Sequence, residues 1–190
     1  MHSTRREFIQ GSTLGLLGIA LQPPSAATAH AAAPEGAPAA APTSALTHDE
    51  AVVLDALGEV MLPGARAAGI SDYIGSQLLL PPERQVLMIK YIVANPPYLD
   101  FYRAGLHSLE AASVARHARH FARLPAAQAA ALVIEAGAGR LPAWSGPPQP
   151  LFHFILRNDA LDVVYGTKQG FNRLGTPYMA HIEPPTAWPQ

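Results

Sequence analysis

The sequence contains no cysteine among its 190 residues. This absence excludes structural disulfides, thiolate zinc sites, iron–sulfur ligation by this chain, and haem attachment through a C-x-x-C-H motif. If the protein works in an oxidising compartment, packing alone must hold its fold together. An apolar fraction of 49% provides enough material for a core.

A strong charge of either sign is also missing, because the formal net charge is −1. A generic nucleic-acid or membrane-surface binder needs a basic excess to neutralise phosphates. The balance therefore argues against both classes. No apolar run after the N-terminal region reaches the roughly 18 residues that predict a membrane span, so we expect no membrane anchor in the mature chain.

Familiar catalytic and cofactor motifs are missing as well. No G-x-G-x-x-G, P-loop, G-x-S-x-G or H-E-x-x-H pattern occurs, and the glycines of "EAGAGRLP" (135–142) follow a predicted helix rather than a strand. No set of nucleophile, base and oxyanion donors is recognisable. We therefore expect no catalytic, cofactor-binding or metal-binding residue in this chain.

The histidines are the first candidates for metal ligation. His117 and His120 stand three residues apart in "RHARH" (116–120), within reach of each other on a helix. The flanking arginines disfavour binding of a cation, and no carboxylate follows at ligand spacing, so a solvated helix end is the favoured interpretation. His107 and His153 stand alone in helical contexts and are expected to be packed or exposed.

Two acidic residues are the candidates for acid–base chemistry. Asp159 and Asp162 lie three apart in "LRNDALDVVYG" and are spaced as paired acids on one helix. The favoured interpretation is structural, with the carboxylates capping the helix or pairing with Arg157.

The N-terminus carries the most informative pattern that is present. "TRREFIQ" (4–10) resembles the twin-arginine signal pattern of Ser/Thr, Arg-Arg, any residue, Phe, a large aliphatic residue and often Lys. It matches at every position except the last, which is Gln10. Arg5, Arg6 and Phe8 are therefore the expected recognition residues for the twin-arginine translocase.

The segments after this pattern complete a signal peptide. An apolar run of about eleven residues follows, which suits a signal-peptide core and is too short to span a bilayer. Ala27-Thr28-Ala29 is the best small-residue cleavage site, with cleavage after Ala29. The chain is predicted to divide into a signal peptide (1–29), an Ala/Pro-rich linker (30–45) and a mature domain (46–190).

Apolar residues recur at helical spacing through the mature domain, and no alternating β-branched run predicts a sheet. Thr47 and Glu50 form a capping-box pattern at the start of the first helix. Asn95-Pro96-Pro97 is expected to start the longest helix, since a prolyl residue suits a first helical position. We predict an all-α fold, an irregular bundle of about five to six helices with a long coil C-terminal tail. The expected helices span 48–62, 71–80, 83–93, 98–117, 125–137 and 151–164.

The tail is rich in glycine and proline yet carries spaced aromatic and apolar residues. Such residues on irregular backbone suit a segment that lies across a surface, either its own core or a partner. The candidate partner-interface residues are Tyr165, Phe171, Tyr178, Met179 and Ile182.

Three stretches resemble sequences of a known protein family: "LGEVMLPGARAAGISDYI" (57–74), "FYRAGLHSLEA" (101–111) and "LRNDALDVVYGTKQGFNRLGTPYMAHIEPP" (156–185). Together with the leader they resemble the gluconate 2-dehydrogenase subunit 3 family. The "PYMAHIEPP" variant is similar to small subunits of FAD-dependent glucose or sorbitol dehydrogenase complexes. The family has no established catalytic residue in this subunit.

The resemblance implies a three-part enzyme. A large flavoprotein subunit would hold FAD and carry out hydride chemistry, and a multihaem cytochrome c subunit would pass electrons to the membrane. The small subunit would carry the signal peptide that the flavoprotein lacks. We therefore expect a non-catalytic subunit and export escort in the periplasm, associated with the membrane only through its partners. The alternatives are a stand-alone periplasmic enzyme using Asp159, Asp162 or His153, and a free-standing binding module.

Overall fold

The computed structural model describes residues 42–92, 95–175, 185 and 188. These residues form helices and no strand, so the predicted all-α class is confirmed. In chain order the elements are α1 (His48–Met61), α2 (Ile70–Gln77), the 3-10 helix η1 (Pro82–Arg84), α3 (Ile89–Ile92), α4 (Leu99–His117), the 3-10 helix η2 (Phe121–Arg123), α5 (Ala126–Gly137), α6 (Gln149–Tyr165) and α7 (Lys168–Arg173).

Helix α1 begins at the predicted capping box. The Thr47 hydroxyl accepts from the Glu50 N–H at 3.3 Å, and the Glu50 carboxylate accepts from the Thr47 N–H at 2.8 Å, so two donors of the first turn are satisfied reciprocally. Leu54 and Leu57 are buried on the inner face. Helix α1 packs against α2, α4, α5 and α6.

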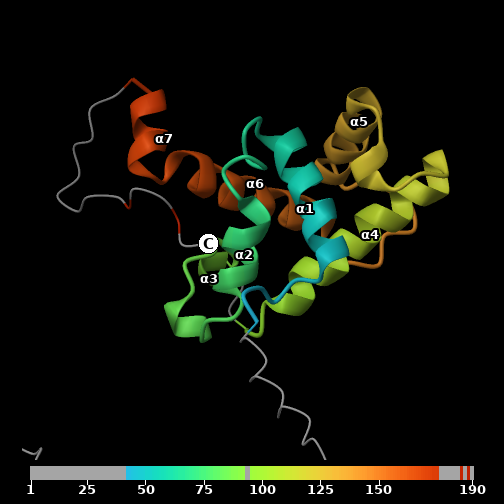
Figure 1. Ribbon diagram of the computed structural model, residues 1–190. Coiled ribbons are helices and arrows are strands. Elements are labelled where there is room, and N and C mark those ends of the chain that lie inside the picture. Colours follow the sequence, from blue (N-terminus) through green and yellow to red (C-terminus); the bar gives the residue numbers. More distant parts are fainter. Residues whose placement is uncertain (1–41, 93–94, 176–184, 186–187, 189–190) are drawn as a thin grey trace, which may run out of the picture. The chain divides into compact units, whose positions relative to one another are not determined.

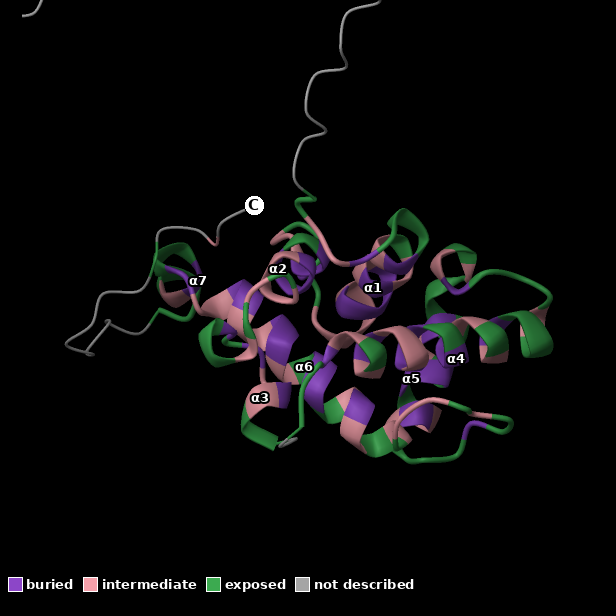
Figure 2. Ribbon diagram, turned by 90° about the horizontal axis from the view of Figure 1, so that it is seen from below, coloured by how far each residue is buried: buried purple, intermediate pink, exposed green. Residues whose placement is uncertain are grey.

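Helix α6 contacts other helices along its whole length. It packs against α4 and α5 near one end and against α2 and α7 near the other (Figure 1). Buried residues lie on the faces that these helices turn toward one another (Figure 2). Gly105 on α4 permits the close approach of α6, because a Cβ there would lie 2.1 Å from the Phe152 ring. Within the described part of the chain, no helix is both long and apolar enough to cross a membrane.

The predicted helix over 83–93 is wrong. The chain instead forms η1, an extended stretch, and the single helical turn of α3. Gln85, Leu87 and Ile89 are buried while Val86 is exposed, which is the alternation of extended backbone. The Met88 N–H donates to a carboxylate of α6 at 2.8 Å instead of to a carbonyl within a helix. Tertiary contacts therefore override the helical spacing of the apolar residues.

The other helices are confirmed with shifted ends. Helix α4 begins at Leu99 with Tyr98 as its N-cap, so Pro97 precedes the helix and does not occupy its first position. Helix α6 begins at Gln149, earlier than predicted, and Pro150 lies in its first turn, where its missing N–H needs no partner. Helix α2 ends at Gln77, short of the predicted Leu80.

Candidate functional site

Asp159 on α6 is the most deeply buried charged side chain among the described residues, with no exposed surface. Its Oδ1 accepts from the Met88 N–H at 2.8 Å, and its Oδ2 accepts from the Tyr102 hydroxyl at 2.7 Å. Burial raises the pKa of Asp159 to about 7, against the opposing effect of these two hydrogen bonds. The carboxyl joins α6, α4 and the 85–88 segment, and no substrate can reach it.

Asp162 lies one turn farther along α6 and is half-buried, which raises the pKa of its carboxyl. Arg157 forms no ion pair with either acid within the described residues, and neither carboxylate caps a helix N-terminus there. The predicted capping or Arg157 pairing is therefore wrong. Asp159 connects separate segments, a role that depends on residues more than fifty positions away.

His120 and His153 have different surroundings and do not share a site. His120 contacts the Glu110 carboxylate at 2.5 Å, and the other Glu110 oxygen accepts from the Phe121 N–H at 3.0 Å, so this pair fixes the start of η2. His153 is half-buried, and burial followed by the nearby Arg157 charge lowers its pKa. Across the described ranges, no group of three or more His, Asp or Glu side chains is arranged to hold a metal ion.

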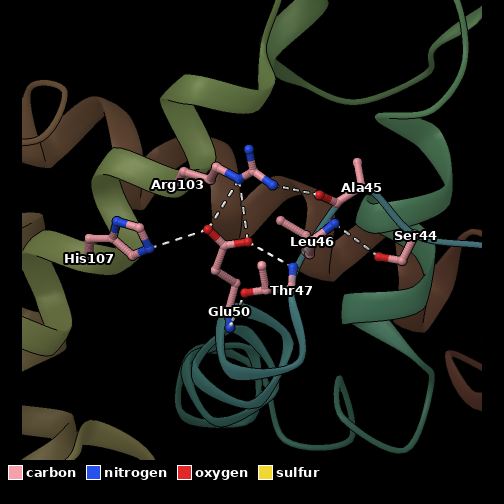
Figure 3. Close-up of polar contacts among 7 residues, drawn as sticks. All are labelled: Ser44, Ala45, Leu46, Thr47, Glu50, Arg103 and His107. Atoms are coloured by element: carbon pink, nitrogen blue, oxygen red, sulfur yellow. Dashed lines mark hydrogen bonds and ion pairs between the residues drawn. The ribbon is translucent and has the colours of Figure 1, made fainter. Parts of the chain in front are cut away.

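A second buried carboxylate, Glu50, contacts side chains that the capping-box pattern did not predict (Figure 3). Besides Thr47, it contacts Arg103 Nε at 3.1 Å and His107 Nε2 at 3.2 Å. Arg103 also donates through Nη2 to the Ala45 carbonyl at 2.9 Å. Burial acts to raise the pKa of Glu50, but the Thr47 hydrogen bonds and the Arg103 charge together hold it below its usual value.

A cleft of about 760 Å³ lies beside Glu50, between α1, α4 and η2. Two separate carboxylate–imidazole pairs border it, Glu50 with His107 and Glu110 with His120. Its apolar wall comes from Val52, Val53, Leu106 and Ala122. Each carboxylate contacts one nitrogen of its imidazole and so fixes the orientation of that ring beside the cleft.

The candidate interface residues of the tail are only partly described. Tyr165, at the end of α6, is half-buried and packs against the core, and Phe171 on α7 is also half-buried. The Thr167 hydroxyl caps α7 by accepting from the Gly170 N–H at 3.0 Å. The remaining predicted residues, of both the interface and the signal peptide, lie outside the described residues: Tyr178, Met179, Ile182, Arg5, Arg6, Phe8 and Ala29.

The tail also makes a contact that the sequence analysis missed. The Trp188 ring lies 5.0 Å from the Tyr73 ring on α2, centroid to centroid, at an interplanar angle of 51°. Its Nε1 donates to the Asp162 carbonyl at 3.1 Å. A single tryptophan in a Pro-rich terminus, "EPPTAWPQ", is the signal that could have indicated it, because tryptophan combines a large apolar surface with one donor.

Comparison with protein families gives a match to gluconate 2-dehydrogenase subunit 3 over residues 48–180. The matched range runs from the first residue of α1 to beyond α7 and so includes all the described helices. Comparisons with curated proteins and with solved structures gave no significant match. Since the match covers more than half of the chain, the protein belongs to the gluconate 2-dehydrogenase subunit 3 family.

Proposed function

We propose that this chain is the non-catalytic small subunit of a periplasmic FAD-dependent sugar or polyol dehydrogenase complex. In this proposal it acts as the maturation and export escort of the flavoprotein subunit. The family assignment makes the chain a subunit of a dehydrogenase complex. Beyond this, we propose the escort role, the FAD of the large subunit, the haem c of a further subunit and the periplasmic location.

The observation that carries the proposal is the twin-arginine pattern, with Arg5, Arg6 and Phe8, in front of a domain with no recognisable cofactor motif. The twin-arginine pathway moves folded proteins. A cysteine-free helical domain gains little from folding before export for its own sake. A large subunit that must acquire FAD in the cytoplasm gains much, so the signal serves the partner.

The arrangement of the described domain is compatible with such a role. Two of its acidic residues with altered pKa values are engaged in the fold, since Asp159 is enclosed and Glu50 is surrounded by partners. The proposed contact with the flavoprotein is the tail, through Tyr165, Phe171, Tyr178, Met179 and Ile182. Aromatic residues and methionine are enriched in protein interfaces, and glycine-rich backbone lets them adapt to a partner surface.

The decisive experiment replaces Arg5 and Arg6 by lysine in the full chain and follows the flavoprotein. A matched control replaces Arg119 and Arg157, two exposed arginines of the mature domain, by lysine. We expect the flavoprotein in the periplasm with the wild-type and control chains, and in the cytoplasm with the leader variant. The amount of flavoprotein in each fraction and its bound FAD are the measurements.

Periplasmic flavoprotein in cells that carry only the Arg5→Lys, Arg6→Lys chain would overturn the escort role. Cytoplasmic retention with the control variant as well would also contradict it, because retention would then not depend on the signal. Co-purification of the two chains from the cytoplasm of the leader variant is expected, since the escort binds before export.

A further inference from the structure

We propose that the cleft between α1, α4 and η2 is a docking groove for one segment of the flavoprotein subunit. In that segment an apolar side chain lies between a basic residue and an acidic residue. The inference rests on the proposed function, because it gives that partner a binding surface on the folded domain. Every residue that carries it belongs to the described part of the chain.

The first end of the groove lies at the start of α1. Asp49 and Glu50 come from the first turn of that helix, and Glu50 contacts His107 of α4 at 3.2 Å. Arg103 lies 3.1 Å from Glu50 and balances its charge. Asp49 is exposed and forms no ion pair with the described residues, so its negative charge is available to a partner.

The second end of the groove lies at η2. Glu110, one turn after His107 on α4, contacts His120 and accepts from the Phe121 N–H at 3.0 Å. Arg123, the last residue of η2, lines the groove and is exposed. It likewise forms no ion pair within the described ranges. Its positive charge is therefore available to an acidic group.

The two ends are separated along α1. η2 packs against α1, and its Ala122 lines a neighbouring cleft together with Ala56. Ala56 lies about two turns beyond Asp49, roughly 10 Å along the helix axis. The negative charge of Asp49 and the positive charge of Arg123 therefore lie toward opposite ends of the groove.

Between its ends the groove is apolar. The wall consists of Val52, Val53, Leu106 and Ala122. Val52 is 42% exposed, so part of this wall is in contact with solvent. Removal of such apolar surface from water favours the binding of an apolar side chain. The volume of about 760 Å³ lies in the range of protein binding sites.

The pattern of charges favours a protein segment as the occupant. An amphipathic segment can place its apolar side chain in a groove, while its charged residues pair with opposite charges at the rim. A basic residue would lie opposite Asp49, an apolar residue over Val52 and Val53, and an acidic residue opposite Arg123. A small ion of one sign would match only one end. Membership of a dehydrogenase complex provides a protein partner for such a surface.

The charges are tested by the affinity of the full chain for the purified FAD-containing large subunit. We expect Asp49→Lys and Arg123→Glu each to weaken binding about tenfold, because each replaces attraction by like-charge repulsion. Asp72→Lys, in the first turn of α2, and Arg84→Glu, at the last residue of η1, are the matched controls. Both control residues are exposed, and their variants should bind as the wild type does. Higher salt should reduce the differences between the variants.

The apolar wall is tested by protection of a thiol. The chain has no cysteine, so Val52→Cys introduces a single thiol into it. We expect the reaction of this thiol with N-ethylmaleimide to slow about tenfold when the flavoprotein binds, because a docked segment excludes solvent. Ile134→Cys on α5, where the isoleucine is 65% exposed, is the control and should react at an unchanged rate. An unchanged rate at position 52 would overturn the groove.

The outcomes separate this inference from the proposed function. Wild-type affinity of both Asp49→Lys and Arg123→Glu would overturn the groove and leave the escort intact. Absence of binding by the wild-type chain would overturn both. Weakened binding together with lost helix, measured by circular dichroism, would assign these residues to the fold and overturn their role in docking. A dimer of the chain alone that Asp49→Lys dissociates would assign the groove to a second copy and overturn the flavoprotein as its occupant.

Discussion

The two buried carboxylates of this domain occupy opposite electrostatic environments. Glu50, at the junction of α1 and α4, contacts the charged Arg103, and its pKa is held below the usual value. Asp159, where α6 meets α4 and the 85–88 segment, receives hydrogen bonds only from neutral donors, and burial raises its pKa to about 7. At Glu50 the Thr47 hydrogen bonds, together with the Arg103 charge, outweigh the effect of burial on the pKa, whereas the two hydrogen bonds to the fully buried Asp159 do not.

The two junctions also differ in what they hold together. Glu50 and Arg103 fix the segment at Ala45 and Thr47 that leads into α1, next to the predicted linker. Asp159 fixes the extended 85–88 segment through Met88. It also lies one helical turn from Asp162, whose carbonyl accepts from Trp188. The Glu50 contacts therefore hold the start of the domain, and the Asp159 contacts join α6 to α4 and to the 85–88 segment.

Removal of the Asp159 side chain should cause the largest loss of stability. Asp159→Ala leaves the Tyr102 hydroxyl and the Met88 N–H buried without their acceptor, and we expect the free energy of unfolding to fall by about 3 kcal/mol. Urea unfolding measures the change. Asp162→Ala on the same helix is the control and should cost less than about 1 kcal/mol, since Asp162 is only half-buried. Equal losses in the two variants would contradict the role assigned to Asp159.

The opposite pKa shifts predict opposite pH dependences. The folded state holds a proton on Asp159 up to about pH 7, whereas the unfolded chain releases it near the ordinary value of 3.8. The stability from this group is therefore full below about pH 4 and is lost as the pH rises toward 7. For Glu50, whose folded pKa is lowered from 4.5, stability is present above that value and is lost as the pH falls below it.

Urea unfolding of the wild type, Asp159→Asn and Glu50→Gln between about pH 2 and pH 8 tests this contrast. The advantage of the wild type over Asp159→Asn should shrink from pH 4 to pH 7. Its advantage over Glu50→Gln should shrink in the other direction, toward low pH. Asp162 is present in all three chains, so its own raised pKa contributes equally to each curve. If the stability advantage of the wild type changed with pH in the same way against both variants, the two carboxylates would have similar environments.

The first of these junctions was partly predictable from the sequence. The capping box of Thr47 and Glu50 is a local pattern, and local hydrogen bonds fix it regardless of the rest of the fold. Arg103 and His107 are more than fifty residues away, and nothing in their sequence context indicates that they meet Glu50. Helical spacing likewise found α1, α4, α5 and α6, whose apolar stripes are long enough to be distinctive.

The Asp159 junction was not predictable for the same physical reason. Val86, Leu87 and Ile89 fit both a helix and an extended strand-like segment, and over so few residues periodicity cannot separate the two. The choice is made by Asp159, which accepts from Met88 across a separation of 71 residues. Trp188 was missed because its partners, Tyr73 and the Asp162 carbonyl, come together only in the folded chain.

The smallest expected effect concerns His107, which contacts Glu50 at 3.2 Å but has 69% of its side chain exposed. A contact at the surface contributes little because solvent screens it, so His107→Ala should lower the free energy of unfolding by no more than about 0.5 kcal/mol. Arg103→Ala should cost more, about 1.5 kcal/mol, because it removes donors to both the buried Glu50 carboxylate and the Ala45 carbonyl. Urea unfolding in low and high salt distinguishes them, since salt weakens exposed interactions more than buried ones. An effect of His107→Ala as large as that of Arg103→Ala would contradict the small contribution assigned to this exposed contact.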